Sequence, residues 1–137
     1  MNGLSDSDKN HLCLTSKGAQ TDGKDEEIKV PGTYDWRKKF PDCVQPVLNI
    51  GKVANCSASY AYTTLSVAED RICMKSKEKV RLSTQEIIDC DGLNNGCEGG
   101  FVNKVLGFGA KNGFNPEECY ETADKKQTCE EDHFENN

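Results

Sequence analysis

Cys56 is the residue of this chain best placed to do chemistry. It follows a loop of about ten residues and begins a stretch whose apolar spacing predicts an amphipathic helix. A cysteine is a nucleophile only as its thiolate, and the unpaired N–H groups and dipole at a helix start lower the pKa of a thiol there. Cys56 is therefore a candidate nucleophile, although a cysteine at a helix start is more often structural than catalytic.

The chain has eight cysteines among its 137 residues, which is a high number for this length. The simplest explanation is a set of disulfides formed in an oxidising compartment, whether lysosome-like, secreted or another space that permits disulfides. A zinc site is the alternative, but no Cys-x-x-Cys pair occurs, and His11 and His133 stand alone near the two ends. We therefore expect no metal and no cofactor. Spacing alone does not decide which cysteines pair.

The helix that would hold Cys56 is the strongest element of the sequence, and we expect it over about residues 56–75. Asn55 is suited to cap its start, and Lys75 suits its end. Its apolar residues recur at spacings of four, three and four, which places them on one helical face: Ala61, Leu65, Ala68 and Ile72.

Two shorter helices are expected downstream. The sequence Ser83-Thr84-Gln85-Glu86 is a capping box that would begin a short helix containing Ile87 and Ile88. A third helix is expected over about residues 101–112, with Gly113 as its C-terminal stop. Its apolar side would consist of Phe101, Val102, Val105, Leu106 and Phe108. Convincing strands are lacking, so the predicted fold class is mainly α.

Composition divides the chain into three parts. Residues 1–29 are polar and predict a flexible leader, residues 30–129 a compact domain, and residues 130–137 an acidic tail. A hydrophobic fraction of 35% predicts a small core. The net charge of -6 argues against nucleic acid and an anionic membrane surface as partners. No apolar stretch reaches the roughly 18 residues that a transmembrane segment needs.

Several segments, in their order and spacing, resemble the N-terminal half of papain-like cysteine peptidases of the cathepsin B, C and X type. The family pattern around the nucleophile is approximately Gln-Gly-x-Cys-Gly-Ser-Cys-Trp-Ala. The segment of this chain that aligns with the pattern is Ile50-Gly51-Lys52-Val53-Ala54-Asn55-Cys56-Ser57-Ala58. The other matching segments are Tyr34-Asp35-Trp36-Arg37, Leu82-Ser83-Thr84-Gln85-Glu86-Ile87-Ile88-Asp89-Cys90 and Asn95-Gly96-Cys97-Glu98-Gly99-Gly100. The resemblance implies the left, helical half-domain of the papain-like fold, with a long central helix and Cys56 as a vestigial nucleophile.

Departures from the family pattern weaken the expected catalytic site. Ile50 stands in place of the glutamine that donates to the oxyanion, and losing one such donor typically costs about 2.7–4 kcal/mol of transition-state stabilisation. Val53 replaces a cysteine that pairs, in the family, with the counterpart of Cys97, and Ser57 replaces the tryptophan. The family's catalytic histidine and asparagine belong to its second half, and this chain ends before that half.

The resemblance also implies a substrate-binding pair and two disulfides. Gly99 and Gly100 match the glycines that bind substrate backbone, although a tight turn before a helix explains them equally well. Cys43–Cys73 resembles a bridge of cathepsin B, and Cys90–Cys129 matches a bridge found throughout the family. Three cysteines remain without an assigned partner: Cys13, Cys97 and Cys119.

These expectations favour a non-catalytic structural or binding subunit of a larger assembly, with a protein partner covering the Cys56 face of the central helix. The alternative is an active cysteine endo- or exopeptidase whose histidine-bearing half is a separate chain or is missing from this sequence. A third possibility is a disulfide-rich binding module that does not descend from an enzyme. Five residues argue against it because they occur in the order of the family pattern: Trp36, Cys56, Cys90, Gly99 and Gly100.

Overall fold

The computed structural model describes residues 31–50, 56–123 and 125–129, and within them the fold is mainly helical. The only β contact in these ranges is an isolated antiparallel bridge between Leu82 and Pro116. The expected leader and acidic tail lie outside the described residues. In chain order the elements are α2 (Trp36–Lys39), the 3-10 helix η1 (Pro41–Cys43), α3 (Ser59–Ser76), α4 (Thr84–Cys90), the 3-10 helix η3 (Gly96–Glu98) and α5 (Val102–Asn112).

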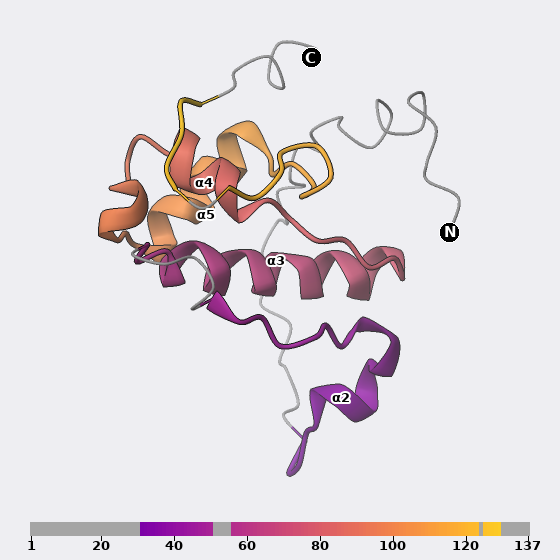
Figure 1. The fold of residues 1–137 in the computed structure, drawn as a ribbon. Coiled ribbons are helices and arrows are strands. Elements are labelled where there is room, and N and C mark those ends of the chain that lie inside the picture. The colour runs from indigo at the N-terminus through magenta and orange to yellow at the C-terminus, as the bar shows by residue number, and fades with distance from the viewer. Residues whose placement is uncertain (1–30, 51–55, 124, 130–137) are drawn as a thin grey trace.

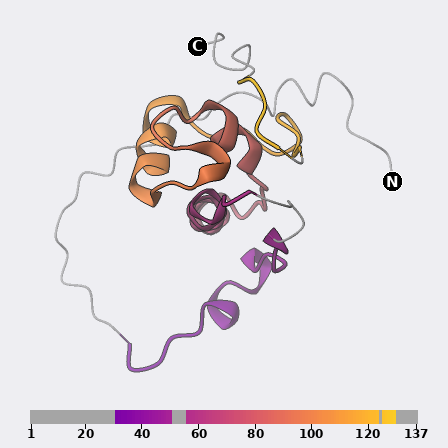
Figure 2. The ribbon, with the colours of Figure 1, turned by 60° about the vertical axis from the view of Figure 1, so that its left-hand side comes forward.

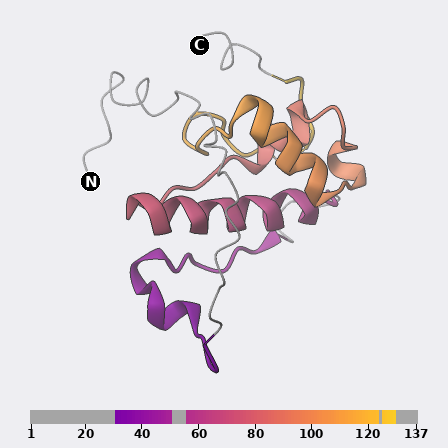
Figure 3. The ribbon, with the colours of Figure 1, turned by 180° about the vertical axis from the view of Figure 1, so that it is seen from behind.

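The long helix α3 separates two layers. In Figure 1 it crosses the middle of the molecule, with α4 and α5 on one side and α2 on the other. Figure 2 looks nearly along α3 and keeps the same separation. The view from behind in Figure 3 agrees with both. The α4–α5 layer covers α3 closely, whereas the layer that contains α2 is thin.

Helix α3 begins three residues later than expected. Its first residue is Ser59, and its N-cap is Ala58, whose side chain makes no capping hydrogen bond. Asn55, the expected cap, lies outside the described residues. The helix ends at Ser76, and its C-cap Lys77 adopts the left-handed conformation with φ 67°.

The buried face of α3 also differs from the predicted apolar stripe at its far end. Ala61 and Leu65 are buried as expected, but Ile72 is 37% exposed. Cys73 is the buried residue there, because it forms a disulfide with Cys43 of η1. Thr64 and Glu69 are buried on the same helix although they are polar. The spacing of apolar residues does not predict buried positions that are occupied by hydrogen-bonded polar side chains.

Helices α4 and α5 follow the sequence prediction closely at their ends. Ser83 Oγ accepts a hydrogen bond from Glu86 N at 3.0 Å, which is half of the expected capping box. The other half is absent, because Ser83 N donates to Asn115 O instead. Gly113 ends α5 with φ 84°.

The expected apolar side of α5 is only partly buried. Val105 and Phe108 belong to the core, whereas Phe101, Val102 and Leu106 are exposed. The core joins α3, α4 and α5 through the following buried residues: Tyr60, Ala61, Leu65, Leu82, Ile87, Val105 and Phe108.

Both disulfides implied by the family resemblance are present. Cys43–Cys73 ties the thin layer to the end of α3, and Cys90–Cys129 ties the C-terminal segment to α4. Cys119 is also disulfide-bonded, and Cys13 lies outside the described residues. Among the residues that the structure describes, no helix has the length and apolar character needed to cross a membrane.

Candidate functional site

The structure overturns the expectation that Cys56 is a nucleophile. Its sulfur is bonded to that of Cys97, so no thiol is available to form a thiolate. Cys56 also precedes the first residue of α3 by three positions and does not sit at the helix start. The backbone supports the same pairing, because Ser57 N donates to Cys97 O at 2.8 Å. Cys56 is therefore a structural cysteine in this structure.

The pairing changes how the sequence aligns with the family pattern. In that pattern the first cysteine bonds to the counterpart of Cys97, and the second is the nucleophile. Because Cys56 bonds to Cys97, it takes the place of the first cysteine, and the alignment shifts by three residues. The shifted segment is Cys56-Ser57-Ala58-Ser59-Tyr60-Ala61, set against Cys-Gly-Ser-Cys-Trp-Ala.

In this alignment the nucleophile position holds Ser59. The position agrees with the structure, since Ser59 is the first residue of α3. Tyr60 then replaces the tryptophan with another aromatic residue, and Ala61 matches the alanine. These two residues were the signal in the sequence that could have found the correct alignment.

The oxyanion position moves as well. In the shifted alignment, Val53 matches the glutamine of the family pattern. It therefore no longer matches the first cysteine of that pattern, to which the unshifted alignment assigned it. Val53 lies outside the described residues. Ile50 is not in the oxyanion position; its side chain is 45% exposed and lines the groove beside α3.

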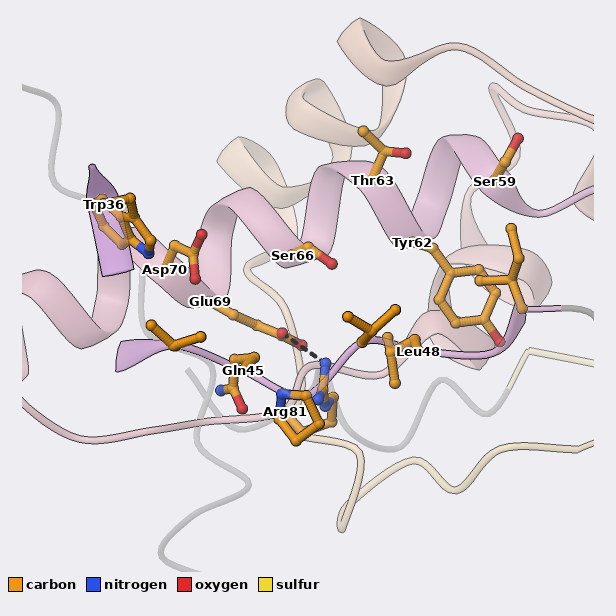
Figure 4. Close-up of a pocket in the computed structure, with 14 residues that line it drawn as sticks. Trp36, Gln45, Leu48, Ser59, Tyr62, Thr63, Ser66, Glu69, Asp70 and Arg81 are labelled. Atoms are coloured by element: carbon orange, nitrogen blue, oxygen red, sulfur yellow. Dashed lines mark hydrogen bonds and ion pairs between the residues drawn. The ribbon is translucent and has the colours of Figure 1, made fainter. Parts of the chain in front are cut away.

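That groove runs along the face of α3 opposite the core and has a volume of about 400 Å³. Figure 4 shows Ser59, Tyr62, Thr63 and Ser66 along the helix, with Gln45 and Leu48 across from it. Ser59 is exposed at one end of this groove. Its hydroxyl is therefore accessible beside a surface that is partly polar and partly apolar.

A buried ion pair forms part of the groove lining. Arg81 Nη1 lies 3.0 Å from Glu69 Oε2, and Leu82 N donates to Glu69 Oε1 at 2.8 Å. Glu69 is only 2% exposed, and this burial raises the pKa of its carboxyl despite the opposing effects of Leu82 N–H and Arg81. The dashed line in Figure 4 marks the pair. Both oxygens of Glu69 are occupied, so its role here is to join α3 to the segment before α4.

The glycine pair lies close to the start of α3. Tyr60 Oη donates to Gly96 O at 2.9 Å, which anchors the loop before Gly99. A Cβ on Gly100 would lie 2.5 Å from Asn94 Oδ1 and 2.7 Å from Tyr60 Cδ2, so packing alone requires glycine there. Gly99 has φ 103°, a conformation that favours glycine. The turn explanation therefore accounts for both glycines without any ligand.

The same pair still leaves backbone groups available to a ligand. Within the described residues, neither the N–H nor the C=O of Gly100 makes a hydrogen bond. An extended peptide could pair with both groups as an added strand.

No general base or metal site can be assigned in the described ranges. They contain no histidine, since His11 and His133 both lie outside them. They also hold no group of three or more metal-ligating side chains. The described residues therefore place an accessible hydroxyl at a helix start without a histidine to act as its base.

Comparison with known proteins agrees with the fold and with the family resemblance. Residues 30–137 match the family described as "Papain family cysteine protease". The chain is 31% identical over 105 residues to Caricain of Carica papaya, covering 77% of this chain and 29% of that protein. It is 30% identical over 92 residues to Cathepsin B of Dictyostelium discoideum, covering 67% and 29%.

A solved structure supports the same assignment. The proform of the Amb a 11 cysteine protease, a major ragweed pollen allergen, superposes with a TM-score of 0.69 at 26% identity, covering 82% of this chain and 34% of that one. The chain thus spans about three-tenths of the length of the curated relatives named above. The disulfides are consistent with the setting of lysosomal or secretory proteases. The chain belongs to the papain family of cysteine proteases and matches only part of that family's domain.

Proposed function

We propose that this chain is a degenerate papain-family half-domain that acts without catalysis, as a structural or binding subunit of a larger assembly. The observation that carries the proposal is the Cys56–Cys97 disulfide, which removes the expected thiol and leaves Ser59 at the start of the central helix. An oxidising compartment of lysosomal or secretory type is its expected location.

A serine at this position is a poor substitute for the cysteine. The helix start stabilises an anion, but a serine hydroxyl stays protonated at physiological pH and needs a general base within hydrogen-bond reach, about 2.6–3.2 Å. The described residues contain no histidine to provide that base. Among the described residues, Ser59 therefore has no histidine partner that would activate it.

The groove beside α3 supports a binding role. Its far wall carries apolar side chains in contact with water: Val47 is 100% exposed, Leu48 39% and Ile50 45%. An apolar surface of this kind is typical of a region that another protein covers. Gly100 adds backbone groups that could hold an extended peptide near the same helix start.

An active enzyme is the alternative, with the histidine-bearing half in a separate chain or outside this sequence. The feature that favours it is the exposure of Ser59 at the helix start, where a nucleophile would stand. In that case Ser59, and not Cys56, would carry the reaction.

The two functions are separated by a peptidase assay on the protein as isolated from its source, with any chains that accompany it. We expect no cleavage of a mixed peptide library above the background of a Ser59→Ala variant. Turnover that disappears in Ser59→Ala but persists in Thr63→Ala, one turn further along the groove, would establish the alternative. Thr63 is the suitable control because it is an exposed hydroxyl residue of the same helix face.

The chemistry of the helix start can be tested independently of any missing half. A Ser59→Cys variant is expected to react with iodoacetamide at pH 7 about 3- to 10-fold faster than Ser76→Cys, because the helix dipole favours the thiolate at one end and opposes it at the other. Both serines are exposed residues of α3, at its first and last positions. Alkylation rates followed by mass spectrometry give the ratio, and equal rates would show that the helix start does not activate a nucleophile.

A further inference from the structure

Glu86 has a carboxyl group buried in the core, and among the described residues Asn115 is the one residue that bonds to it. It is the third residue of α4 and is 0% exposed, as is Asn115 in the segment after α5. Asn115 N donates to Glu86 Oε2 at 2.9 Å, and Asn115 Nδ2 donates to Glu86 Oε1 at 3.0 Å. One residue therefore supplies both hydrogen bonds to the carboxylate.

No cation pairs with this carboxylate among the described residues. On α3, Glu69 is engaged by Arg81, and on α5, Lys104 Nζ donates to Leu93 O. The remaining charged groups of the neighbouring segments have other partners or face solvent: Asp89 of α4, Lys111 of α5, and Glu117, Glu118 and Glu121 beyond Asn115. A negative charge on Glu86 is thus offset only by these hydrogen bonds and by its place in the first turn of α4, which together compensate part of the cost of burial.

Asn115 can serve the neutral form of Glu86 as well as the charged form. Its Oδ1 is buried and makes no hydrogen bond within the described residues. A protonated carboxyl becomes a donor, and rotation of the amide by half a turn would present Oδ1 to accept that proton. The pair therefore stays hydrogen-bonded in both protonation states, but only the neutral state avoids a buried charge that is incompletely compensated.

The pair sits where two distant segments meet. Ser83 N donates to Asn115 O at 2.9 Å, and Glu117 N donates to Arg81 O at 2.8 Å, on either side of the Leu82–Pro116 bridge. These contacts hold the segment after α5 against the start of α4. A charge that forms at Glu86 would act directly on this junction.

We propose that Glu86 and Asn115 form an acid-strengthened latch, which holds the segment after α5 to α4 most firmly at acidic pH and loosens as the pH becomes neutral. The latch is independent of catalysis and operates whether the half-domain binds peptides or only supports other chains. It suits a protein that matures or works in an acidic compartment.

The direction of the pH dependence follows from burial. Desolvation raises the pKa of Glu86 to about 7, against the lowering effect of the two Asn115 hydrogen bonds. Because the folded protein holds this proton more tightly than the unfolded chain, the stabilisation is complete at low pH. It is lost as the pH rises from the unfolded pKa through about 7.

The test is urea unfolding of the full, disulfide-bonded chain at several pH values from 5 to 8, together with Glu86→Gln. For the parent protein we expect the folding equilibrium constant to fall by about 70-fold across this range because of Glu86. Glu86→Gln has no charge to bury and is expected to remove that fall. The matched control is Glu69→Gln, which should lower stability but keep the part of the fall that Glu86 causes, since Glu86 is intact; any part due to the raised pKa of Glu69 is removed.

A second measurement covers the case in which Glu86→Gln does not fold. The side-chain carboxyl carbon of Glu86 can be followed by NMR in the parent protein while the pH is changed. A midpoint near 7, with protection of the Asn115 and Glu117 amides that decreases above it after correction for the intrinsic pH dependence of exchange, supports the latch. A midpoint near the ordinary value for glutamate, or an equal pH dependence in the parent and Glu86→Gln, would overturn it.

Discussion

The Cys56→Ser variant is expected to lose about 3–4 kcal/mol of unfolding free energy and to leave peptide turnover unchanged. The loss arises because the Cys56–Cys97 bond closes a loop with a sequence separation of 41, which restricts the unfolded chain. Chemical unfolding followed by circular dichroism gives the stability, and a peptide library gives the turnover. A double variant, Cys56→Ser with Cys97→Ser, should show the same loss without leaving a reactive thiol.

The single variant Cys97→Ser is the matched control for this prediction. It breaks the same disulfide but retains the Cys56 side chain, so a structural role makes the two single variants equivalent. If Cys56 were the nucleophile of an assembled enzyme, Cys56→Ser would abolish turnover and Cys97→Ser would not. That asymmetry would restore the assignment that the disulfide overturns.

The Glu69→Leu variant is expected to lower the unfolding free energy by about 3 kcal/mol. Leucine fills a similar volume, but it leaves Leu82 N without an acceptor and Arg81 without its partner in a partly buried site. The net cost exceeds that of a surface ion pair because Glu69 is 2% exposed. Urea unfolding at pH 7 measures the difference.

Asp70→Asn provides the comparison for Glu69. Asp70 is the next residue of α3, lines the same groove and is only partly buried. Its replacement is expected to change stability by less than about 0.5 kcal/mol. Similar losses in the two variants would mean that the Glu69–Arg81 pair does not hold α3 to the segment before α4.

Local signals in the sequence predicted most of the helices. Ser83 as a cap, Gly113 as a stop and the periodic apolar residues of α3 each act within a few residues of their own position. The physical basis of such signals is short-range, since capping and helical periodicity depend on neighbours along the chain. The element types were accordingly correct, while the start of α3 was misplaced by three residues.

Burial was harder to predict than helix position. Ile72 and Leu106 fit the apolar pattern but are exposed, whereas Glu69, Glu86 and Asn115 are buried. Each of these polar side chains is buried with a partner distant in sequence, such as Arg81 for Glu69 at a separation of 12 and Asn115 for Glu86 at 29. Apolar periodicity carries no information about such pairs.

The sequence alone determined the family and the mainly helical class, because these depend on residue order and on motifs that survive substitution. The Cys43–Cys73 and Cys90–Cys129 pairs followed from the resemblance to that family and not from spacing. Only the tertiary structure decided what Cys56 does. Two alignments of the same short motif were possible, and they differ by three residues, nearly one helical turn. The choice between them depends on which sulfur lies beside Cys97. That contact joins residues 41 positions apart, and it forms only when the loop before α5 folds against the start of α3.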